Sequence, residues 1–145
     1  MKKLLLILLL MITVKAYAPA DRVVYIESPP CINPYLDLYQ AACSIESSNR
    51  PETINLEEHA YGLVQIRQCK LDDFNQETGK KYTLQDCLVP EISKEIYMYF
   101  ASKFDHKDYE LIAKKWNGSG PKTYEYWRKI QGKLNNIALL NHSAN

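Results

Sequence analysis

A glutamate near the end of a predicted helix is the residue best placed for acid–base chemistry. Asn33 and Pro34 are typical of a helix start, with a capping side chain followed by proline at the first helical position. Helical spacing of apolar residues continues from there and predicts a helix over 34–48. Glu46 follows Ala42 by four residues, so it lies on or beside the apolar stripe. Its carboxyl group is either turned out to water or partly desolvated, and desolvation would raise its pKa and suit it to donate a proton.

A second segment whose side chains could take part in binding or catalysis follows after a polar loop. Residues 52–61 are mostly polar, and residues 62–66 are Gly-Leu-Val-Gln-Ile, a short apolar run that contains one glutamine. The run predicts a strand or an irregular turn with Gly62 at the bend. Gln65 is therefore a candidate for a polar side chain in a groove, with simple exposure to solvent as the alternative.

Four blocks of the sequence resemble, in their order and spacing, the signature of the soluble lytic transglycosylases, a family similar to goose-type lysozyme. The blocks cover roughly residues 35–131 and are Glu46-Ser47 with Pro51, Ala60-x-Gly62-Leu63-Val64-Gln65-Ile66, Ile112-Ala113-Lys114-Lys115-Trp116-Asn117-Gly118, and Thr123-x-x-Tyr126-Trp127-x-Lys129-Ile130. The chain departs from the family pattern at Val64, where methionine is usual, and at Asn55, where serine is usual.

The resemblance implies a lysozyme-like fold, in which helical lobes and a small β element flank a saccharide groove. It implies an enzyme, a lyase that cleaves the MurNAc–GlcNAc β-1,4 bond of cell-wall peptidoglycan and needs no cofactor. Glu46 would be the single acid and base, and the product would carry a 1,6-anhydro ring on its muramoyl end. No metal is expected either, because the chain lacks a CxxC motif and its three histidines are scattered.

The resemblance also implies a set of substrate-binding residues around Glu46. They are Ser47, Gln65, Tyr97, Trp116, Asn117, Gly118 and Tyr126. Tyr97 and Tyr99 compete for one position, since the register of their helix does not decide between them, and the Tyr126 hydroxyl is expected to hold the carboxyl group in place. Each position has a structural alternative, because aromatic residues are common in cores and Asn-Gly is a common helix end.

Two other functions are compatible with the same expected fold. A hydrolase similar to goose-type lysozyme would use a second carboxylate to activate water, and Glu57 and Glu58 in the polar loop are the candidates. A non-enzymatic saccharide-binding or assembly protein would bind without turnover. Anhydro ends, reducing ends or no products, respectively, would distinguish the three functions.

Further helices are predicted along the rest of the chain to support these residues. They cover 70–78 with Gly79 as C-cap, 90–104 with Pro90 at the start, 108–116, and 123–138, with a capping turn at 83–86 and a frayed tail at 141–145. The predicted fold class is therefore mainly α, with a small β element in an α+β arrangement.

The first twenty residues have the pattern of a secretory signal peptide. Lys2 and Lys3 precede a nine-residue apolar core, shorter than the ~20 residues of a transmembrane span, and small-residue cleavage sites fall at 16–20. Residues 21–145 then form one exported domain, periplasmic or extracellular, without a stable membrane anchor. Cleavage after Ala20 removes three of the 18 basic residues and none of the 17 acidic ones. The resulting net charge of −2 does not favour nucleic acid as a partner, so we expect a monomer that acts on glycan strands and that a larger envelope complex can recruit.

All four cysteines lie in the part expected to be exported, where two disulfides can form. If a helix begins at Pro34, its rise alone separates Cys43 from its start by ~13 Å, so a bond to Cys31 needs the chain to fold back. Cys69 and Cys87 flank one compact segment and are the preferred disulfide pair.

Overall fold

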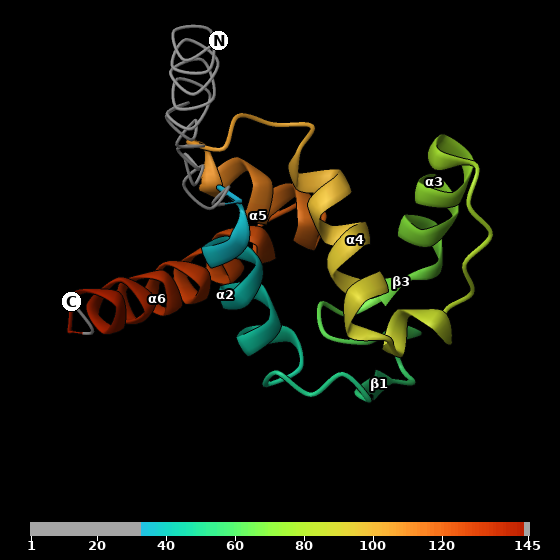
Figure 1. The fold of residues 1–145 in the computed structure, drawn as a ribbon, viewed down its shortest axis with the longest axis horizontal. Helices are drawn as coiled ribbons and strands as arrows, with labels where there is room; N and C mark the ends of the chain where they lie inside the picture. Colours follow the sequence, from blue (N-terminus) through green and yellow to red (C-terminus); the bar gives the residue numbers. More distant parts are fainter. Residues whose placement is uncertain (1–32, 144–145) are drawn as a thin grey trace, which may run out of the picture. The chain divides into compact units, whose positions relative to one another are not determined.

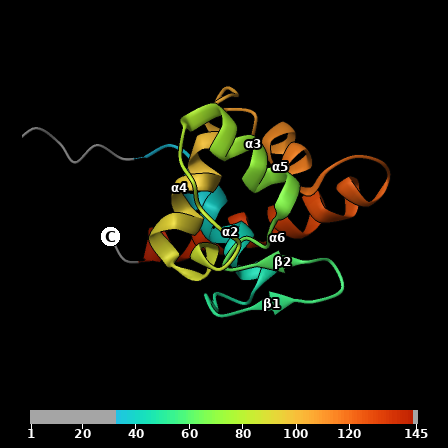
Figure 2. The same ribbon diagram turned by 90° about the vertical axis from the view of Figure 1, so that its right-hand side faces the viewer.

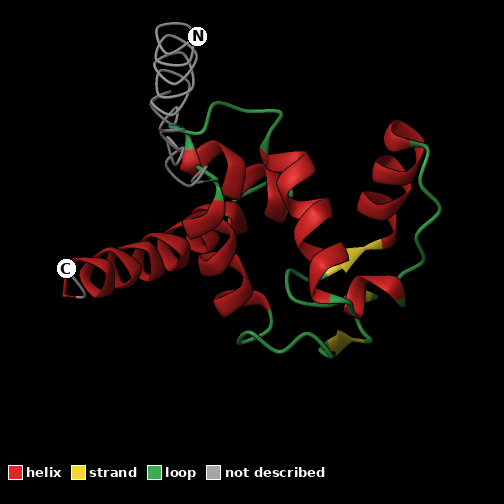
Figure 3. Cartoon of the chain, in the orientation of Figure 1, coloured by secondary structure: helices red, strands yellow, loops and turns green. Residues whose placement is uncertain are grey.

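Helices dominate residues 33–143, the part of the chain that the computed structural model describes (Figures 1 and 3). The elements in this part are α2 (Leu36–Glu46), β1 (Ile54–Asn55), β2 (Ala60–Tyr61), β3 (Ile66–Arg67), α3 (Gln68–Thr78), the 3-10 helix η2 (Asp86–Leu88), α4 (Pro90–Ala101), α5 (Tyr109–Asn117) and α6 (Lys122–Ser143). The prediction of a mainly helical chain with a small β element is thus confirmed. The predicted signal peptide and Cys31 lie outside the described residues.

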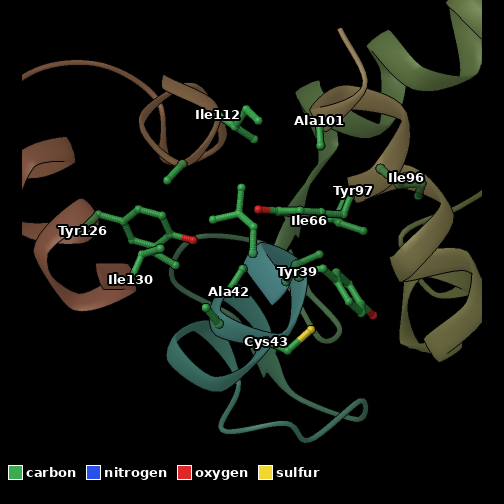
Figure 4. Close-up of a cluster of buried hydrophobic side chains, with 14 of the residues drawn as sticks. Tyr39, Ala42, Cys43, Ile66, Ile96, Tyr97, Ala101, Ile112, Tyr126 and Ile130 are labelled. Atoms are coloured by element: carbon green, nitrogen blue, oxygen red, sulfur yellow. The ribbon is translucent and has the colours of Figure 1, made fainter. Parts of the chain in front are cut away.

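Helix α2 lies at the centre of the core and contacts α4, α5 and α6. Two of its buried residues, Ala41 and Ala42, are small enough to let the neighbouring helices approach closely. Figure 4 shows Tyr126 and Ile130 of α6 on one side of α2 and Tyr97 of α4 on the other. Because α2 is held from both sides, the end of the helix, where Glu46 lies, has a fixed position.

Local sequence signals explain where several helices begin and end. Pro90 occupies the first turn of α4, and the Asp108 side chain caps α5 by accepting a hydrogen bond from the backbone N–H of Leu111 at 3.0 Å. Gly79 ends α3 in the left-handed conformation and donates its N–H to the carbonyl of Asn75. These three predicted boundaries are confirmed.

The small sheet occupies part of the segment predicted to be a polar loop. Strands β1 and β2 pair antiparallel with Ile54 opposite Tyr61, and β2 pairs with β3 in the same way (Figure 2). Each strand has two residues, too few for an alternating pattern to appear in the sequence. For residues 62–67 the sequence predicts a strand or an irregular turn, and both are present: Ile66–Arg67 is a strand, and the preceding four residues form a turn.

Helix ends differ from the predictions where the sequence lacks a strong signal. α3 begins at Gln68 rather than at residue 70, and α4 ends at Ala101 rather than at residue 104. α6 continues to Ser143, so the predicted frayed tail is wrong for residues 141–143. No proline or glycine interrupts α6 after Gly132, and Figure 1 shows its C-terminal half extending away from the other helices.

Gly62 makes the bend between β2 and the turn that follows. Its φ angle is +79°, and a Cβ atom there would lie 2.0 Å from the carbonyl oxygen of Cys87. The backbone N–H of Gly62 donates to the carbonyl of Thr53 at 2.9 Å. Only glycine fits this position, because both the backbone angle and the close approach of η2 exclude a side chain.

The predicted disulfide between Cys69 and Cys87 is absent, and this prediction is wrong. Cys43, Cys69 and Cys87 are all free thiols. Cys87 is buried in η2 against Gly62, whereas Cys69 is exposed in the first turn of α3. The two residues flank one segment in the sequence, but in the fold one is buried and the other is exposed.

None of the helices in the described range is both long and apolar enough to span a lipid bilayer.

Candidate active site

Glu46 is the last residue of α2, and its carboxyl group is largely removed from water. Burial is the largest influence on this group and raises the pKa of Glu46 to about 7. The Tyr126 hydroxyl and the cations Arg67 and Lys129 act in the opposite direction, while the negative charge of Glu58 adds to the increase. Of the two alternatives for this residue, the structure therefore has the desolvated one. At neutral pH both protonation states of this carboxyl group are well populated.

Tyr126 and Tyr97 approach the end of α2 from opposite sides. Figure 4 shows the ring of Tyr126, on α6, and the ring of Tyr97, on α4, with their hydroxyl groups pointing toward one another. The Tyr126 hydroxyl is buried and has no hydrogen-bond partner of standard geometry within residues 33–143. It is nevertheless close enough to Glu46 to lower the pKa of that carboxyl group. Burial raises the pKa of both tyrosines, and the charge of Glu46 raises both further. Both hydroxyl groups therefore stay protonated and can act as hydrogen-bond donors.

The competition between Tyr97 and Tyr99 is resolved by their surroundings. Tyr97 is 1% exposed, and its ring centroid lies 5.5 Å from that of Tyr39 and 4.7 Å from that of Trp116. Tyr99 points instead toward α3, where its hydroxyl donates to Glu77. Tyr97 is therefore the tyrosine at the site, and its buried ring supports the wall of the groove.

The turn that carries Gln65 is fixed by its own side chain. Gln65 has a φ angle of +51°, and its Nε2 donates to the carbonyls of Gly62 at 2.9 Å and Thr53 at 3.3 Å. The remaining Oε1 is left as a hydrogen-bond acceptor for a ligand. Trp116 fixes the same turn from α5, because its Nε1 donates to the carbonyl of Val64 at 3.2 Å.

These residues surround a cavity of about 150 Å³ at Glu46. The lining residues are Glu46, Gln65, Ile66, Arg67, Cys69, Lys70, Trp116, Asn117 and Gly118. Five of the eight predicted site residues therefore lie together here, and a sixth, Tyr126, lines the adjoining cleft.

The adjoining cleft is larger and more polar, with a volume of about 780 Å³. It is lined by Glu58, Arg67, Asn117, Gly118, Ser119, Lys122, Glu125, Tyr126 and Lys129. The cleft and the cavity share Arg67, Asn117 and Gly118, so together they form a groove that passes Glu46. A groove of this kind suits an extended polar ligand.

Three predicted residues, Ser47, Tyr97 and Glu57, line neither the cavity nor the larger cleft. Ser47 is buried, and its hydroxyl donates to the carbonyl of Cys43 at 3.1 Å, where it closes the last turn of α2. Glu57 does not line either cavity, whereas Glu58 lines the larger cleft and forms an ion pair with Arg67. Ser47 thus has a structural role in this conformation, and Glu58 is the remaining candidate for a second carboxylate.

The sequence interpretation missed the cations of the groove, chiefly Arg67, Lys70 and Lys129. Arg67 comes two residues after Gln65, a spacing that places both side chains on one face when the chain is extended. This spacing was a usable signal for Arg67. The sequence held no comparable signal for Lys70, because its position depends on how α3 packs against α4 and α5.

The chain matches no family model, no curated protein and no solved structure. Within residues 33–143 there is also no cluster of three or more His, Cys, Asp or Glu side chains that could hold a metal ion.

Proposed function

We propose that the protein is a peptidoglycan lytic transglycosylase with a lysozyme-like fold, in which Glu46 is the single catalytic acid and base. The observation that carries the proposal is a carboxyl group with a pKa of about 7 in the wall of an open groove. A group with this pKa can both donate and accept a proton at neutral pH. The four sequence blocks that resemble the family support the same conclusion, because they supply most of the groove residues.

Glu46 would transfer one proton in each direction during the reaction. In the first step it donates its proton to the glycosidic oxygen, and the bond from that oxygen to the muramoyl C1 breaks. In the second step the Glu46 carboxylate removes the proton from the 6-hydroxyl of the same sugar, and the bond between O6 and C1 forms. No water is consumed, and Glu46 ends the cycle protonated as it began.

The other groove residues would bind and orient the glycan strand. The free Oε1 of Gln65 accepts a hydrogen bond from a sugar N–H or hydroxyl group, and Trp116 offers a partly exposed ring beside it. The Tyr126 hydroxyl donates toward Glu46 and stabilises its carboxylate form between the two steps. Asn117 lies where the cavity and the larger cleft meet, so it contacts the sugars on both sides of the scissile bond.

A hydrolase is the second candidate, and one observation favours keeping it. Glu58 lines the groove, and its charge affects the pKa of Glu46. A carboxylate in this position could activate water in place of the 6-hydroxyl. Its carboxylate forms an ion pair with Arg67, which would have to open before Glu58 could activate water.

Mass spectrometry of the products from purified peptidoglycan distinguishes the candidates. A transglycosylase releases muropeptides with 1,6-anhydro ends, each lighter by one water than a reducing end, and Glu58→Gln retains this activity. A hydrolase releases reducing ends and loses activity with Glu58→Gln. Binding to peptidoglycan by the folded protein without any release would reject both enzymes and support a binding or assembly protein.

The proposal includes export, because the substrate lies outside the cytoplasmic membrane. The signal-peptide pattern over residues 1–20 supports a periplasmic or extracellular location. N-terminal sequencing of the secreted protein tests this part, and a start between residues 17 and 21 is expected.

A further inference from the structure

Lys70 is a partly buried cation at the end of the groove. It lies in the first turn of α3, and its Nζ is 4.8 Å from the centroid of the Phe100 ring and 5.3 Å from that of Trp116. No carboxylate within residues 33–143 lies at ion-pair distance from it. Lys70 also lines the cavity at Glu46, so its ammonium group faces the proposed substrate path.

Lys70 belongs to a second, smaller cleft of about 170 Å³, which we call the cationic cleft. Its lining residues are Lys70, Phe100, Lys103, Phe104, Ile112, Lys115 and Trp116. Three of them are lysines, four are apolar or aromatic, and none is acidic. The cationic cleft shares Lys70 and Trp116 with the cavity at Glu46 and therefore adjoins the groove.

The three lysines of the cationic cleft differ in how well their charges are balanced. Lys103 lies 4.9 Å from the Phe100 ring centroid but is paired with Glu77. Lys115 is exposed, so water solvates its ammonium group. Lys70 has neither a carboxylate at ion-pair distance nor full solvation, and it is the cation that gains most from an added anion.

Electrostatics at Lys70 agree with this description. Burial is the largest influence and lowers the pKa of Lys70, and the positive charges of Lys103 and Arg67 lower it further. The nearby Cys69 and Asp73 raise it in part. The folded protein therefore maintains a positive charge here at a cost in free energy, which a bound anion would reduce.

We infer that the cationic cleft binds a carboxylate of the peptide stems that the glycan strand carries, with Lys70 as the donor. The inference rests on the proposed function and specifies its substrate as stem-bearing strands. The sugars of a stem-bearing strand are neutral, because each lactyl carboxyl group that carries a stem is an amide. The negative charges are those of the stem carboxylates, so a site with three cations is suited to the stem. The apolar floor formed by Phe100, Phe104 and Ile112 fits the methyl group of an alanine next to such a carboxylate.

A binding experiment tests the cationic cleft without requiring cleavage. The amide NMR spectrum of the mature protein is titrated with a synthetic stem tetrapeptide that ends in alanine, and with the same peptide after amidation of its carboxylates. We expect shifts at Lys70, Phe100 and the Trp116 indole, and little binding of the amidated peptide. Equal binding of both peptides, or no binding of either, overturns the inference.

Matched variants identify the donor. Lys70→Met keeps the aliphatic packing on Phe100 and Trp116 and should weaken binding of the stem peptide about tenfold, as expected for loss of a charge-assisted hydrogen bond. Lys70→Arg should restore most of it. Lys94→Met, at an exposed position of α4 that lines none of these cavities, makes the same change in charge and should leave binding unchanged. An equal effect of Lys70→Met and Lys94→Met overturns the role of Lys70.

A cleavage experiment tests whether Lys70 binds a stem carboxylate or the lactyl carboxylate. The lactyl carboxylate is free once an amidase has removed the stems. Lys70→Met should lower kcat/KM about tenfold more on stem-bearing strands than on stem-free strands. An equal loss on both substrates overturns the inference in favour of the lactyl group or of a structural role for Lys70. If the parent protein cleaves neither substrate, the proposed function fails. The NMR titration still decides whether the cationic cleft binds a stem carboxylate.

Discussion

Glu46 and Glu95 each have a tyrosine hydroxyl as a neighbour, yet their pKa values change in opposite directions. Tyr126 lies beside Glu46, whose pKa is raised to about 7. Tyr82 donates a hydrogen bond to Glu95 at 3.0 Å, and the pKa of Glu95 is lowered, chiefly by its hydrogen bond with Lys80. The tyrosine lowers the carboxyl pKa at both sites, so burial and the presence of a cation decide the result.

Glu77 repeats the arrangement of Glu95 on the same side of the molecule. Its carboxylate is exposed, accepts hydrogen bonds from Lys103 and Tyr99, and has a lowered pKa. Both glutamates connect neighbouring elements at the surface, where α3 and the segment after it meet α4. The comparison indicates that the pKa of Glu46 is raised because its carboxyl group is buried and no lysine of the described range forms an ion pair with it.

The largest expected difference between the two regions is in activity. Glu46→Gln should reduce the release of soluble muropeptides by ~10²–10⁴-fold or more, because glutamine cannot donate the proton and one residue serves both steps. Glu95→Gln makes the same chemical change at the surface and should retain nearly all activity. Product release is measured from purified peptidoglycan at neutral pH, with circular dichroism to verify folding. A folded Glu46→Gln protein within about tenfold of the parent would contradict the role of Glu46.

The second difference is in how stability depends on pH. The pKa of Glu46 is raised from 4.5 to about 7, so the folded state retains a proton that the unfolded state loses. This stabilisation is complete below pH 4.5 and is lost as the pH rises through about 7, a change on the order of 3 kcal/mol.

Denaturant unfolding across this pH range provides the measurement. Glu46→Gln, which does not titrate, should be more stable than the parent above pH 7 and should lose this advantage near pH 4.5. Glu95→Gln should retain the pH dependence of the parent, because a lowered pKa places its titration at more acidic values. Identical pH dependence of the parent and Glu46→Gln would show that the carboxyl group is solvated.

The third difference concerns the glycines that support each region. Gly62, beneath the Gln65 turn, and Gly79, at the end of α3, have similar φ angles of +79° and +73°. A side chain at Gly62 would meet the Cys87 carbonyl, whereas nothing lies within 4 Å of the Gly79 position. Gly62→Ala should therefore cost roughly 2–3 kcal/mol of unfolding free energy, and Gly79→Ala about 1 kcal/mol. Equal losses in urea unfolding would mean that η2 can move to accommodate the added methyl group at little cost in free energy.

The smallest expected difference comes from the two tyrosines. Tyr126→Phe removes a hydroxyl that lowers the pKa of Glu46, so the alkaline limb of the pH–rate profile should move to higher pH. The rate at neutral pH should fall about tenfold, as for loss of one positioning hydrogen bond. Tyr82→Phe should change neither the profile nor the rate. A fall in rate without a shift of the profile would assign Tyr126 a purely structural role.

The sequence was sufficient to predict the parts of the site that depend on local signals. The apolar stripe and the four-residue spacing from Ala42 together place Glu46 at the edge of the core, although the helix covers Leu36–Glu46 rather than the predicted 34–48. Pro90, Asp108 and Gly79 mark helix ends by their own backbone and capping properties. These features depend on neighbours within a few residues, so they can be predicted from the sequence without the tertiary fold.

Features that depend on tertiary packing could not be predicted in this way. The position of Lys70 over Phe100 and Trp116 requires three helices to be in place, and Tyr97 could be chosen over Tyr99 only from the packing of α4. The two-residue strands leave no periodic pattern, because hydrogen bonds between distant residues define them. The proposed pairing of Cys69 with Cys87 failed because tertiary packing buries Cys87 in η2 and leaves Cys69 exposed on α3, which closeness in sequence does not reveal.

The position of Trp116 makes the groove observable by fluorescence. The chain has two tryptophans, and Trp127, on α6, lines none of the cavities described here. Trp116 borders both the cavity at Glu46 and the cationic cleft, with its indole N–H bonded to Val64 and the Lys70 ammonium over its ring. In a Trp127→Phe protein the emission would come from Trp116 alone, so a ligand that displaces water from either cavity shifts its wavelength. The protein thus contains its own optical reporter, with which the binding and release of a ligand in the groove can be followed in real time without a label.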